Sequence, residues 1–389
     1  MRSQVIIIGG GPAGLLLACK LFKENIDFVL IEQRTKEYVL SRIRAGVLET
    51  GTVNQLIEVG VGERLKFESQ VHEGVYFSTS QDFFHINFQK LTNKSITVYG
   101  QTEITKDMYD ALESWGANLV FEAKGVDIID HTSDCPKVTY EKDGATHEIR
   151  SDIVVGCDGF HGICKTKIKG NSDGSYLAQL PIGWLGILSE TPPLKDELIY
   201  SRSNRGFALA SMRSHTRSRY YIQVPISDSP QNWTDESFWQ ELKLRFPEEI
   251  VANLITGPSI EKSIAPLRTY VSKSMREGRL LLCGDSAHIV PPTGAKGLNL
   301  AASDVFYAYE AIIRYFQEND LAGLENYSEL ALLRVWKSMR FSWWMTKMLH
   351  LIPDSKPFEE KIMESELSHL RDSLAMQRVF AENYTGLPY

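Results

Sequence analysis

The chain has 389 residues, of which 43% are hydrophobic and 23% are charged, and it carries a formal net charge of −7. Because a single core stops growing at roughly 250–300 residues, this length predicts more than one packing unit. The acidic balance and the lack of a Lys/Arg run exclude sequence-independent binding of nucleic acid, which needs many cations. No apolar stretch approaches the ~18 residues that a membrane span requires, so no membrane partner is expected.

The five cysteines are scattered, and none of them forms a Cys-x-x-Cys motif. Such a set predicts neither a disulfide framework nor a zinc site, and we expect no metal ligands. Reduced thiols are typical of a cytoplasmic protein. The apolar run near Met1 is interrupted by glycines after four residues, so it predicts a strand and not a signal peptide.

The first elements along the chain predict a βαβ unit. Val5 to Ile8 is a short apolar run that ends in glycines, Leu15 to Phe22 predicts a buried helix, and Phe28 to Ile31 predicts a second strand. Pro12 suits the first turn of the helix, where its missing N–H is not needed. A strand, a glycine turn, a helix and a strand in this order are typical of a dinucleotide-binding fold.

Later segments predict sheets and then helices. Aromatic and polar residues roughly alternate from Val75 to Val98, which predicts antiparallel strands. Several strands are expected between Gly183 and Val224, and Leu280 to Leu282 predicts another. A long helix is expected from Gly297, and the chain from Leu321 onward is mostly helical in pattern.

The first turn has the spacing Gly9-x-Gly11-x-x-Gly14. The first glycine permits a tight turn, the second lets a pyrophosphate approach the backbone, and the third lets helix and strand pack closely. The helix N-terminus then presents N–H groups and its positive dipole end to the phosphates. Glu32, at the end of the second strand, can accept hydrogen bonds from ribose hydroxyls, so the unit predicts a bound dinucleotide.

Two further Gly/Asp motifs favour FAD over NAD as that dinucleotide. Asp158 follows one buried strand and Asp285 follows another. A carboxylate at such a strand end can bond the ribityl hydroxyls of a flavin, and Gly294 and Gly297 let the backbone approach a flat ring. The helix from Gly297 would direct its N–H groups at the flavin, where negative charge appears on reduction.

Together these motifs resemble those of the group A flavoprotein monooxygenases, which hydroxylate aromatic rings. The resemblance covers essentially the whole chain, and its longer stretches are similar to the branch of this family that acts on 4-hydroxybenzoate. These stretches are residues 38–49, 97–103, 156–162, 263–268, 285–303, 340–345 and 382–388.

The resemblance implies a reaction of aromatic catabolism. NAD(P)H reduces FAD, the reduced flavin takes up O₂ as a C4a-hydroperoxide, and one oxygen atom is transferred to the ring carbon next to the phenol. The product from 4-hydroxybenzoate is 3,4-dihydroxybenzoate. The resemblance also implies a small aromatic acid as substrate and a homodimer as the assembly.

The resemblance assigns part of an arginine cluster to the substrate. Arg213 would form a bidentate pair with the substrate carboxylate, and Ser211 and Tyr221 would add hydroxyl donors. We interpret Arg217 and Arg219 as residues of the sheet edge or of the cofactor side.

A second set of residues would act on the phenol. Tyr200 would accept its hydrogen bond, Tyr384 would continue the relay, and His72, whose ordinary pKa suits the task, would carry the proton towards solvent. Pro292 and Thr293 would bring backbone groups near the reacting oxygen.

The remaining assignments concern the flavin. Lys296 would add positive potential that favours phenolate and reduced flavin, and Trp184 would pack where the flavin can swing outward. Further contacts with FAD are assigned to Arg42, Arg44, Gln101, Leu298 and Asn299.

The nicotinamide nucleotide would visit the same site. Family members that use NADPH carry Arg and then Gln after the ribose carboxylate, whereas this chain has Gln33 and then Arg34. An arginine near a 2′-phosphate favours NADPH, so we expect NADPH, and the reversed order leaves the use of NADH open. The other nicotinamide-side positions match the family: Tyr38, Arg42, His161 and Arg268.

Two other functions remain open at this point. A related flavin hydroxylase would act on 3-hydroxybenzoate, 4-aminobenzoate or a dihydroxybenzoate, but it should alter Tyr200, Tyr384 or Arg213, and none is altered. A non-catalytic FAD- or nucleotide-binding module would need neither the carboxylate clamp nor the tyrosine relay.

We expect a mixed α/β fold with a Rossmann-like FAD-binding domain, a sheet-rich substrate domain and C-terminal helices. The FAD-binding domain is assembled from non-contiguous segments, because the nucleotide motifs lie at residues 9, 158 and 285. The expected bounds are 1–70, 96–175 and 269–320 for the FAD-binding domain, 71–95 and 176–268 for the substrate domain, and 321–389 for the C-terminal region.

Overall fold

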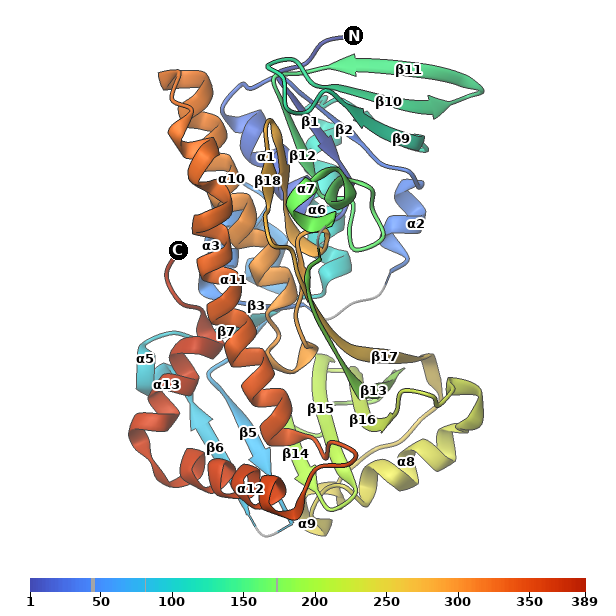
Figure 1. Ribbon diagram of the computed structural model, residues 1–389. Coiled ribbons are helices and arrows are strands. Elements are labelled where there is room, and N and C mark those ends of the chain that lie inside the picture. The colour runs from blue at the N-terminus through green and yellow to red at the C-terminus, as the bar shows by residue number, and fades with distance from the viewer. Residues whose placement is uncertain (43–45, 81, 173) are drawn as a thin grey trace.

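The computed structural model describes residues 1–42, 46–80, 82–172 and 174–389. Two large sheets dominate the molecule, and the long helices α10 (Gly297–Glu318) and α11 (Ala322–Leu349) run along one side of it (Figure 1). The mixed α/β class predicted from the sequence is confirmed.

The first sheet has six strands in the order β18-β19-β12-β1-β2-β8, and only the pair β18–β19 is antiparallel. Its strands are β1 (Val5–Ile8), β2 (Phe28–Ile31), β8 (Leu119–Val120), β12 (Ile153–Gly156), β18 (Arg276–Glu277) and β19 (Leu280–Leu282). Strands β1 and β2 coincide with the predicted ones, and α1 (Pro12–Lys23) extends the predicted helix at both ends. The sheet therefore draws on three distant stretches of the chain.

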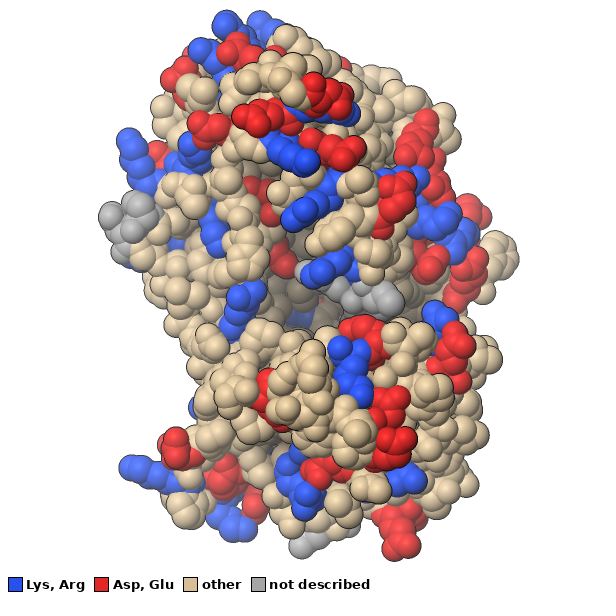
Figure 2. All heavy atoms as spheres, turned by 90° about the vertical axis from the view of Figure 1, so that its right-hand side faces the viewer, with Lys and Arg blue, Asp and Glu red and all other residues tan. Residues whose placement is uncertain are grey.

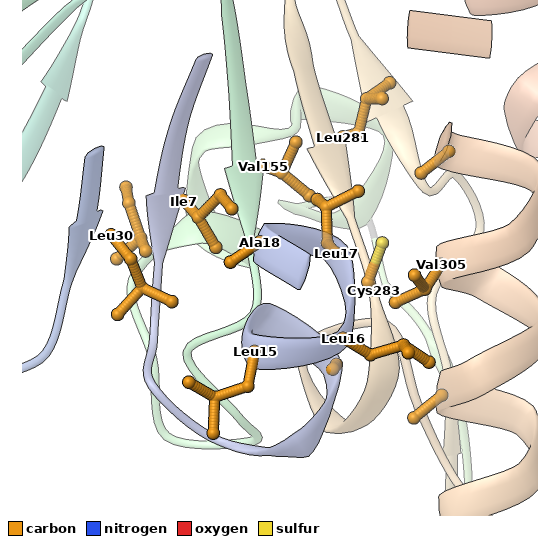
Figure 3. Close-up of a cluster of buried hydrophobic side chains, with 14 of the residues drawn as sticks. Ile7, Leu15, Leu16, Leu17, Ala18, Leu30, Val155, Leu281, Cys283 and Val305 are labelled. Atoms are coloured by element: carbon orange, nitrogen blue, oxygen red, sulfur yellow. The ribbon is translucent and has the colours of Figure 1, made fainter. Parts of the chain in front are cut away.

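The core of this sheet fixes the strand ends from which the nucleotide motifs emerge. Ile7 and Val155 lie on neighbouring strands, and Leu16 points from α1 towards Val305 of α10 (Figure 3). All four side chains are buried, as expected where helices cover a parallel sheet. The turns at the carboxyl ends of these strands are therefore held in place by a well-packed core.

The second sheet has eight strands in the order β20-β17-β13-β16-β15-β14-β5-β6, and β14–β5 is its parallel pair. Its strands are β5 (Gly74–Ser78), β6 (Phe83–Asn87), β13 (Tyr176–Ser189), β14 (Ile199–Ser203), β15 (Gly206–Ser214), β16 (Arg217–Pro225), β17 (Ser259–Val271) and β20 (His288–Ile289). The strands predicted between Gly183 and Val224 are confirmed. Because β20 pairs with β17, the chain that follows β19 passes directly from one sheet to the other.

The alternation from Val75 to Val98 predicted strands throughout, and this is wrong in the middle. Helix α5 (Phe88–Thr92) interrupts the strands, because the Asn87 side chain accepts a hydrogen bond from the Lys90 N–H at 2.7 Å and caps the helix. Asn93 ends it with φ of +56°. The next strand, β7 (Ile96–Val98), joins a separate small sheet with β3 (Val47–Leu48) and β4 (Gln70–His72).

Helix α11 links the cores of the two large sheets. Its first half contributes Tyr327 and Val335 to the core of the six-stranded sheet, and its second half contributes Phe341 and Met345 to the core beside the eight-stranded sheet. Two further helices, α12 (Pro357–Asp372) and α13 (Leu374–Thr385), contact that second half, through Trp344–Glu366 and Phe341–Phe380 respectively. Residues of α11 can therefore position groups on both sides of the space between the sheets.

The remaining elements lie around this frame. A second small sheet projects from the N-terminal half and consists of β9 (Lys124–Ile129), β10 (Lys137–Lys142) and β11 (Ala145–Arg150) (Figure 1). The other helices are α2 (Lys36–Leu40), α3 (Thr50–Glu58), α4 (Glu63–Glu68), α6 (Gln101–Ser114), α7 (Lys169–Ser172), α8 (Asp235–Lys243) and α9 (Glu248–Val251). Among the described residues, none of the helices combines the length and apolar character that crossing a bilayer demands.

Candidate active site

A cavity of about 870 Å³ is lined by residues of both large sheets. Gly9 and Gly11, in the turn between β1 and α1, line one part of it, and Tyr200 of β14 and Arg213 of β15 line another. Figure 2 shows the surface hollowed between the two halves of the molecule. The predicted nucleotide motifs and the predicted substrate residues therefore share one space.

The glycine turn has a geometry that only glycines permit at two positions. Gly9 has φ of +112°, and a Cβ there would lie 2.3 Å from the carbonyl oxygen of Cys157. A Cβ on Gly14 would lie 2.0 Å from the carbonyl oxygen of Gly9, so Gly14 permits the close approach of helix and turn. A Cβ on Gly11 would meet nothing within 4 Å, and Gly11 lines the cavity, so this position leaves room for a ligand.

Glu32 holds the turn from the neighbouring strand. Its Oε2 accepts a hydrogen bond from the Gly10 N–H at 2.7 Å, and its Oε1 accepts one from the Arg34 N–H at 2.8 Å. The hydroxyl of Tyr109 donates to the Gly10 carbonyl at 2.6 Å. Each carboxylate oxygen keeps a further lone pair, and Glu32 lines the cavity, so it can still accept from a ribose hydroxyl.

The carboxylates predicted to bind the flavin, Asp158 and Asp285, both line the cavity. Oδ2 of Asp158 accepts a hydrogen bond from the Cys164 N–H at 2.9 Å, whereas its Oδ1 is buried and has no partner within the described chain. Burial raises the pKa of Asp158. A buried oxygen of this kind is satisfied when a ligand supplies a hydroxyl donor.

A buried pair fastens the loop that carries Asp285. Nε2 of His288 lies 2.6 Å from Oδ2 of Asp304 in α10, and the same oxygen accepts from the Gly284 N–H at 2.8 Å. Burial alone would lower the pKa of His288, but the charge of Asp304 raises it. The pair thereby ties the Gly/Asp loop to the helix that follows it.

The two later glycines have different surroundings. A Cβ on Gly294 would lie 2.7 Å from Oγ of Ser342 in α11, so this glycine serves the packing of the loop against the helix. Gly297 lines the cavity, and a Cβ there would meet nothing within 4 Å. Of the two glycines, only Gly297, at the N-terminus of α10, lines the cavity where a flat ring could approach the backbone.

Ser211, Arg213 and Tyr221 all line the cavity. Ser211 and Arg213 share one face of β15, because side chains alternate along a strand. Nη1 of Arg213 is buried and has no hydrogen-bond partner within the described chain, and Glu261, whose charge acts on Arg213, is already paired with Arg219. A buried guanidinium nitrogen without a partner, on an arginine that also bonds the Tyr221 side chain, favours an anionic ligand.

The neighbouring arginines are engaged elsewhere. Arg219 is buried, bonds Glu261, and lies 5.1 Å from the centre of the Tyr221 ring. Arg217 is exposed and pairs with Glu190 at 2.7 Å. Neither lines the cavity, so Arg217 is a residue of the sheet surface and Arg219 packs behind Tyr221.

Tyr200 lies at the cavity, and Tyr384 lies behind it. The Tyr200 hydroxyl donates to the carbonyl oxygen of Thr293 at 3.1 Å and lies 2.6 Å from the hydroxyl of Tyr384. Tyr200 and Pro292 line the cavity, whereas Thr293 and Tyr384 do not. Burial raises the pKa of both phenols. A proton that reaches the Tyr200 oxygen can therefore be passed on to Tyr384.

Lys296 belongs to a buried ionic cluster that the sequence did not predict. Its Nζ donates to Oε1 of Glu49 at 2.6 Å and to the carbonyl oxygen of Tyr384 at 3.0 Å. Nη2 of Arg334 donates to Oε2 of Glu49 at 3.0 Å. Burial lowers the pKa of Lys296. Two cations against one carboxylate leave a net charge of +1, so the positive potential expected from Lys296 is shared with Arg334.

His72 does not have the environment that was predicted for it. It is 1% exposed, and neither ring nitrogen has a hydrogen-bond partner within the described chain. Burial lowers the pKa of His72 to about 4, because a poorly solvated site disfavours the imidazolium. The ordinary pKa that was expected is therefore wrong, and the ring is neutral near pH 7.

Four of the five predicted nicotinamide-side residues are exposed and line the cavity: Arg34, Tyr38, Arg42 and His161. The guanidinium carbons of Arg34 and Arg42 lie 5.0 and 6.0 Å from the centre of the Tyr38 ring. Arg268 does not line the cavity, and its guanidinium lies 4.4 Å from the Phe160 ring.

Of the other residues predicted to contact FAD, some line the cavity and others do not. Gln101 and Leu298 line the cavity. Asn299 does not, and its Oδ1 accepts hydrogen bonds from the Glu49 N–H at 2.9 Å and from the Thr52 hydroxyl at 2.8 Å. Asn299 thus fastens α10 to the start of α3. Arg44 lies outside the described residues.

Sequence reasoning missed four residues that hold the site together: Glu49, Tyr109, Asp304 and Arg334. Each acts through a partner far away in the sequence, so no local spacing marks it. For Asp304 and Arg334 the available signal was their type, since a charged side chain in α10 or α11 is rarely buried without a partner. Glu49 and Tyr109 had no such signal.

These parts define a flavoprotein of the monooxygenase class. The residues fit FAD, because the open space beside Gly11, the unpartnered Oδ1 of Asp158 and the N-terminus of α10 at Gly297 belong to the lining of one cavity. Arg213, whose Nη1 has no partner within the described chain, and Tyr200 line the same cavity, where an organic acid can meet the cofactor.

Comparison with known proteins supports the same class of protein. A family model described as "FAD binding domain" matches residues 2–342. The p-hydroxybenzoate hydroxylase of Acinetobacter baylyi is 50% identical over 390 residues, which cover 100% of this chain and 96% of that protein. The chain belongs to this FAD-binding family, and the predicted resemblance to the flavoprotein aromatic hydroxylases is confirmed.

Solved structures show the same fold at low sequence identity. The p-nitrophenol 4-monooxygenase of Pseudomonas putida has a TM-score of 0.77 at 17% identity, covering 99% of both chains. A probable FAD-dependent monooxygenase of Pseudomonas aeruginosa has a TM-score of 0.78 at 17% identity, covering 95% of this chain and 100% of its own.

Proposed function

We propose that this chain converts 4-hydroxybenzoate to 3,4-dihydroxybenzoate with NADPH and O₂. One observation carries the proposal: the cavity with the dinucleotide turn is also lined by Arg213, whose Nη1 has no partner within the described chain, and by Tyr200, which is hydrogen-bonded to Tyr384. A guanidinium suits a carboxylate, and a tyrosine pair suits a phenol. The relative named p-hydroxybenzoate hydroxylase, half identical over the whole chain, supports the same substrate.

The strand register separates the two groups that would hold the substrate. Tyr200 of β14 stands opposite Leu209 of β15, and Ser211 and Arg213 follow on the same face of that strand. The phenol-binding and carboxylate-binding side chains therefore start from different points along the sheet, as a ring with two separate polar groups requires.

FAD, once reduced by the nicotinamide donor, supplies the activation of O₂, and the side chains prepare the substrate. Arg213 binds the carboxylate, with Ser211 and Tyr221 as further donors. If the Tyr200 hydroxyl donates to the Thr293 carbonyl, its oxygen is free to accept the hydrogen bond of the phenol. When that proton moves to Tyr200, the Tyr200 hydroxyl would turn from the Thr293 carbonyl to Tyr384 and pass its own proton on. Tyr384 would then release its hydroxyl proton towards solvent, and the ring would gain the electron density that hydroxylation needs.

The surroundings of the phenol favour its ionised form. The cluster of Lys296, Arg334 and Glu49 carries a net positive charge and is buried. In a site of low dielectric, such a charge lowers the free energy of a nearby phenolate more than it would in water. Burial of Tyr200 and Tyr384 also keeps water away from the proton path, which limits wasteful reaction of activated oxygen with water.

The proposal includes NADPH as the electron donor. Arg34 lies at the exposed part of the cavity lining, within 5.0 Å of the Tyr38 ring. In Arg34→Ala, kcat/KM should fall about tenfold or more with NADPH and change little with NADH, because only NADPH has a 2′-phosphate for the arginine. Equal losses with both donors, or a wild-type preference for NADH, would contradict this assignment.

The proposal also includes a cytoplasmic homodimer. The five cysteines are all free, which suits a reducing compartment. Leu333 and Trp336 are exposed on one face of α11, and such apolar positions are common where two subunits meet.

Product analysis tests the proposed substrate. Purified enzyme with FAD and NADPH is given 4-hydroxybenzoate, 3-hydroxybenzoate or 4-aminobenzoate, and the hydroxylated products are identified by mass and retention time. We expect 3,4-dihydroxybenzoate from the first and little product from the others. A dominant product from another acid would favour a related hydroxylase, and protein without flavin absorbance would favour a non-catalytic module.

A further inference from the structure

His350, directly after α11, is a buried histidine with a defined tautomer. Its Nδ1 donates to the carbonyl oxygen of Thr346 at 2.8 Å, so the ring proton is on Nδ1. Its Nε2 therefore accepts the hydrogen bond of the Trp184 indole N–H at 2.7 Å. Burial lowers the pKa of His350 to about 3, which keeps Nε2 available as an acceptor near neutral pH.

Trp184 connects this histidine to the cavity. The indole lines the cavity, stacks on Phe207 with ring centres 4.8 Å apart, and is tilted against Tyr221 at 5.1 Å. Phe207 in turn stacks on His350 at 4.3 Å and lies 6.3 Å from Tyr200. These three rings, Trp184, Phe207 and His350, form an aromatic floor that contacts both the carboxylate clamp and the tyrosine relay.

The segment that carries His350 is itself held firmly. Nη1 of Arg202 donates to the carbonyl oxygens of Met348 and His350 at 2.9 and 3.1 Å. One turn earlier in α11, the hydroxyl of Thr346 lies 2.8 Å from that of Thr293, whose carbonyl accepts from Tyr200. The end of α11 therefore reaches both the Tyr200 side and the Trp184 side of the cavity.

We propose that His350 is a positioning residue for the hydroxylation: by accepting the indole hydrogen bond, it fixes Trp184 in the floor and so sets the shape of the substrate end of the cavity. The inference rests on the proposed function, because the substrate end is defined by the acid that binds there. His350 does not line the cavity and acts only through Trp184.

Removal of the acceptor should free the indole. In His350→Leu the Trp184 N–H would be buried without a partner, which is unfavourable, so the ring would turn towards the open side, which is the cavity. We expect the Kd for 4-hydroxybenzoate to rise about tenfold, the effect of one lost hydrogen bond. The FAD content should not change, since no residue of the floor belongs to the glycine turn or the Gly/Asp loops.

The test compares His350→Leu with His350→Gln, which still offers an acceptor near the position of Nε2, and with Trp184→Phe, which removes the donor. The first readout is the indole N–H resonance of Trp184, assigned by its absence in Trp184→Phe. We expect it to shift and exchange faster in His350→Leu and to be largely restored in His350→Gln. The second readout is the Kd for 4-hydroxybenzoate, measured from the change in flavin absorbance.

A double mutant separates positioning from general destabilisation. In the Trp184→Phe background, His350→Leu should add little to the loss of affinity, because the bond it removes no longer exists. An unchanged Trp184 resonance, or a full additional loss in the double mutant, would overturn the proposal. Wild-type enzyme that makes no 3,4-dihydroxybenzoate would instead contradict the proposed function, so the two failures are distinguishable. If His350→Leu does not fold, His350→Gln still gives both readouts and Trp184→Phe still gives the Kd.

Discussion

The hydroxyl oxygens of Tyr200 and Tyr384 lie 2.6 Å apart, and each side chain is only 1% exposed. Tyr200 alone of the two lines the cavity. A phenol that enters the cavity can therefore exchange a proton with the protein through Tyr200 without contact with bulk water. This relationship links the burial of two aromatic residues to the ionisation of the substrate.

Replacement of Tyr200 tests that link. In Tyr200→Phe, the rate of hydroxylation should fall by about 10²–10⁴-fold, the usual contribution of a positioned proton-transfer group, while NADPH oxidation continues and yields H₂O₂. Stopped-flow absorbance and product analysis measure the two rates. Tyr220→Phe is the matched control, because Tyr220 is also a buried tyrosine of the eight-stranded sheet and does not line the cavity. Unchanged product yield in Tyr200→Phe would remove its role.

Arg213 should account for most of the binding of the carboxylate. Arg213→Ala should raise the Kd for 4-hydroxybenzoate by about 10²-fold, or about 3 kcal/mol, because the substrate carboxylate would be buried without its cation. Titration followed by flavin absorbance measures this. The exposed pair Arg217–Glu190 on the same sheet provides the control, since Arg217→Ala should change the Kd by less than about twofold. Equal affinities of Arg213→Ala and wild type would refute the clamp.

Gly11 offers a test of the FAD site that does not depend on catalysis. A Cβ at this position meets nothing within 4 Å, so Gly11→Ala should fold normally and yet lose FAD, because only the bound pyrophosphate would collide with the methyl group. Gly14→Ala should instead fail to fold properly, since its Cβ would lie 2.0 Å from the Gly9 carbonyl oxygen. Flavin content and circular dichroism distinguish the two. Full flavin content in Gly11→Ala would contradict the predicted approach of the pyrophosphate.

The buried His72 should make the protein sensitive to acid. Its pKa of about 4 lies below the ordinary value of 6.5, so the unfolded state binds more protons between pH 6.5 and pH 4. The stability contributed by the neutral ring is present above pH 6.5 and is lost as the pH falls, by about 2 kcal/mol at pH 5.

Urea unfolding at pH 7 and pH 5 measures this loss. His72→Leu should reduce the difference between the two free energies of unfolding by about 2 kcal/mol. His147→Leu, which changes an exposed histidine on β11, should leave the difference as it is. If His72→Leu showed the same difference as the wild type, the ring would not be buried in its neutral form.

Sequence patterns predicted the parts of the fold that local physics determines. The glycine spacing, Pro12 and the apolar runs were sufficient for β1, α1 and β2, because each signal lies within the element it specifies. The helix α5 was missed because an alternating aromatic pattern hid it, although Asn87 and Asn93 are typical of helix ends. In this segment the capping residue Asn87 indicated the structure better than the alternation of aromatic and polar residues did.

The site was predicted unevenly for a similar reason. Ser211 and Arg213 fall on one face of a single strand, so their joint position follows from the sequence. The cluster of Glu49, Lys296 and Arg334 brings together three distant segments, and only tertiary packing brings them within hydrogen-bond distance. The lowered pKa of His72 could not be predicted either, because it depends on burial that the neighbouring residues in the sequence do not indicate.

The proposed function requires that the cavity couple NADPH oxidation to hydroxylation of 4-hydroxybenzoate. The most direct measurement is the amount of 3,4-dihydroxybenzoate formed per NADPH consumed by the wild-type enzyme with bound FAD. We expect a ratio near one, with little H₂O₂ released. NADPH oxidation that is stimulated by 4-hydroxybenzoate but gives H₂O₂ and no 3,4-dihydroxybenzoate would contradict it.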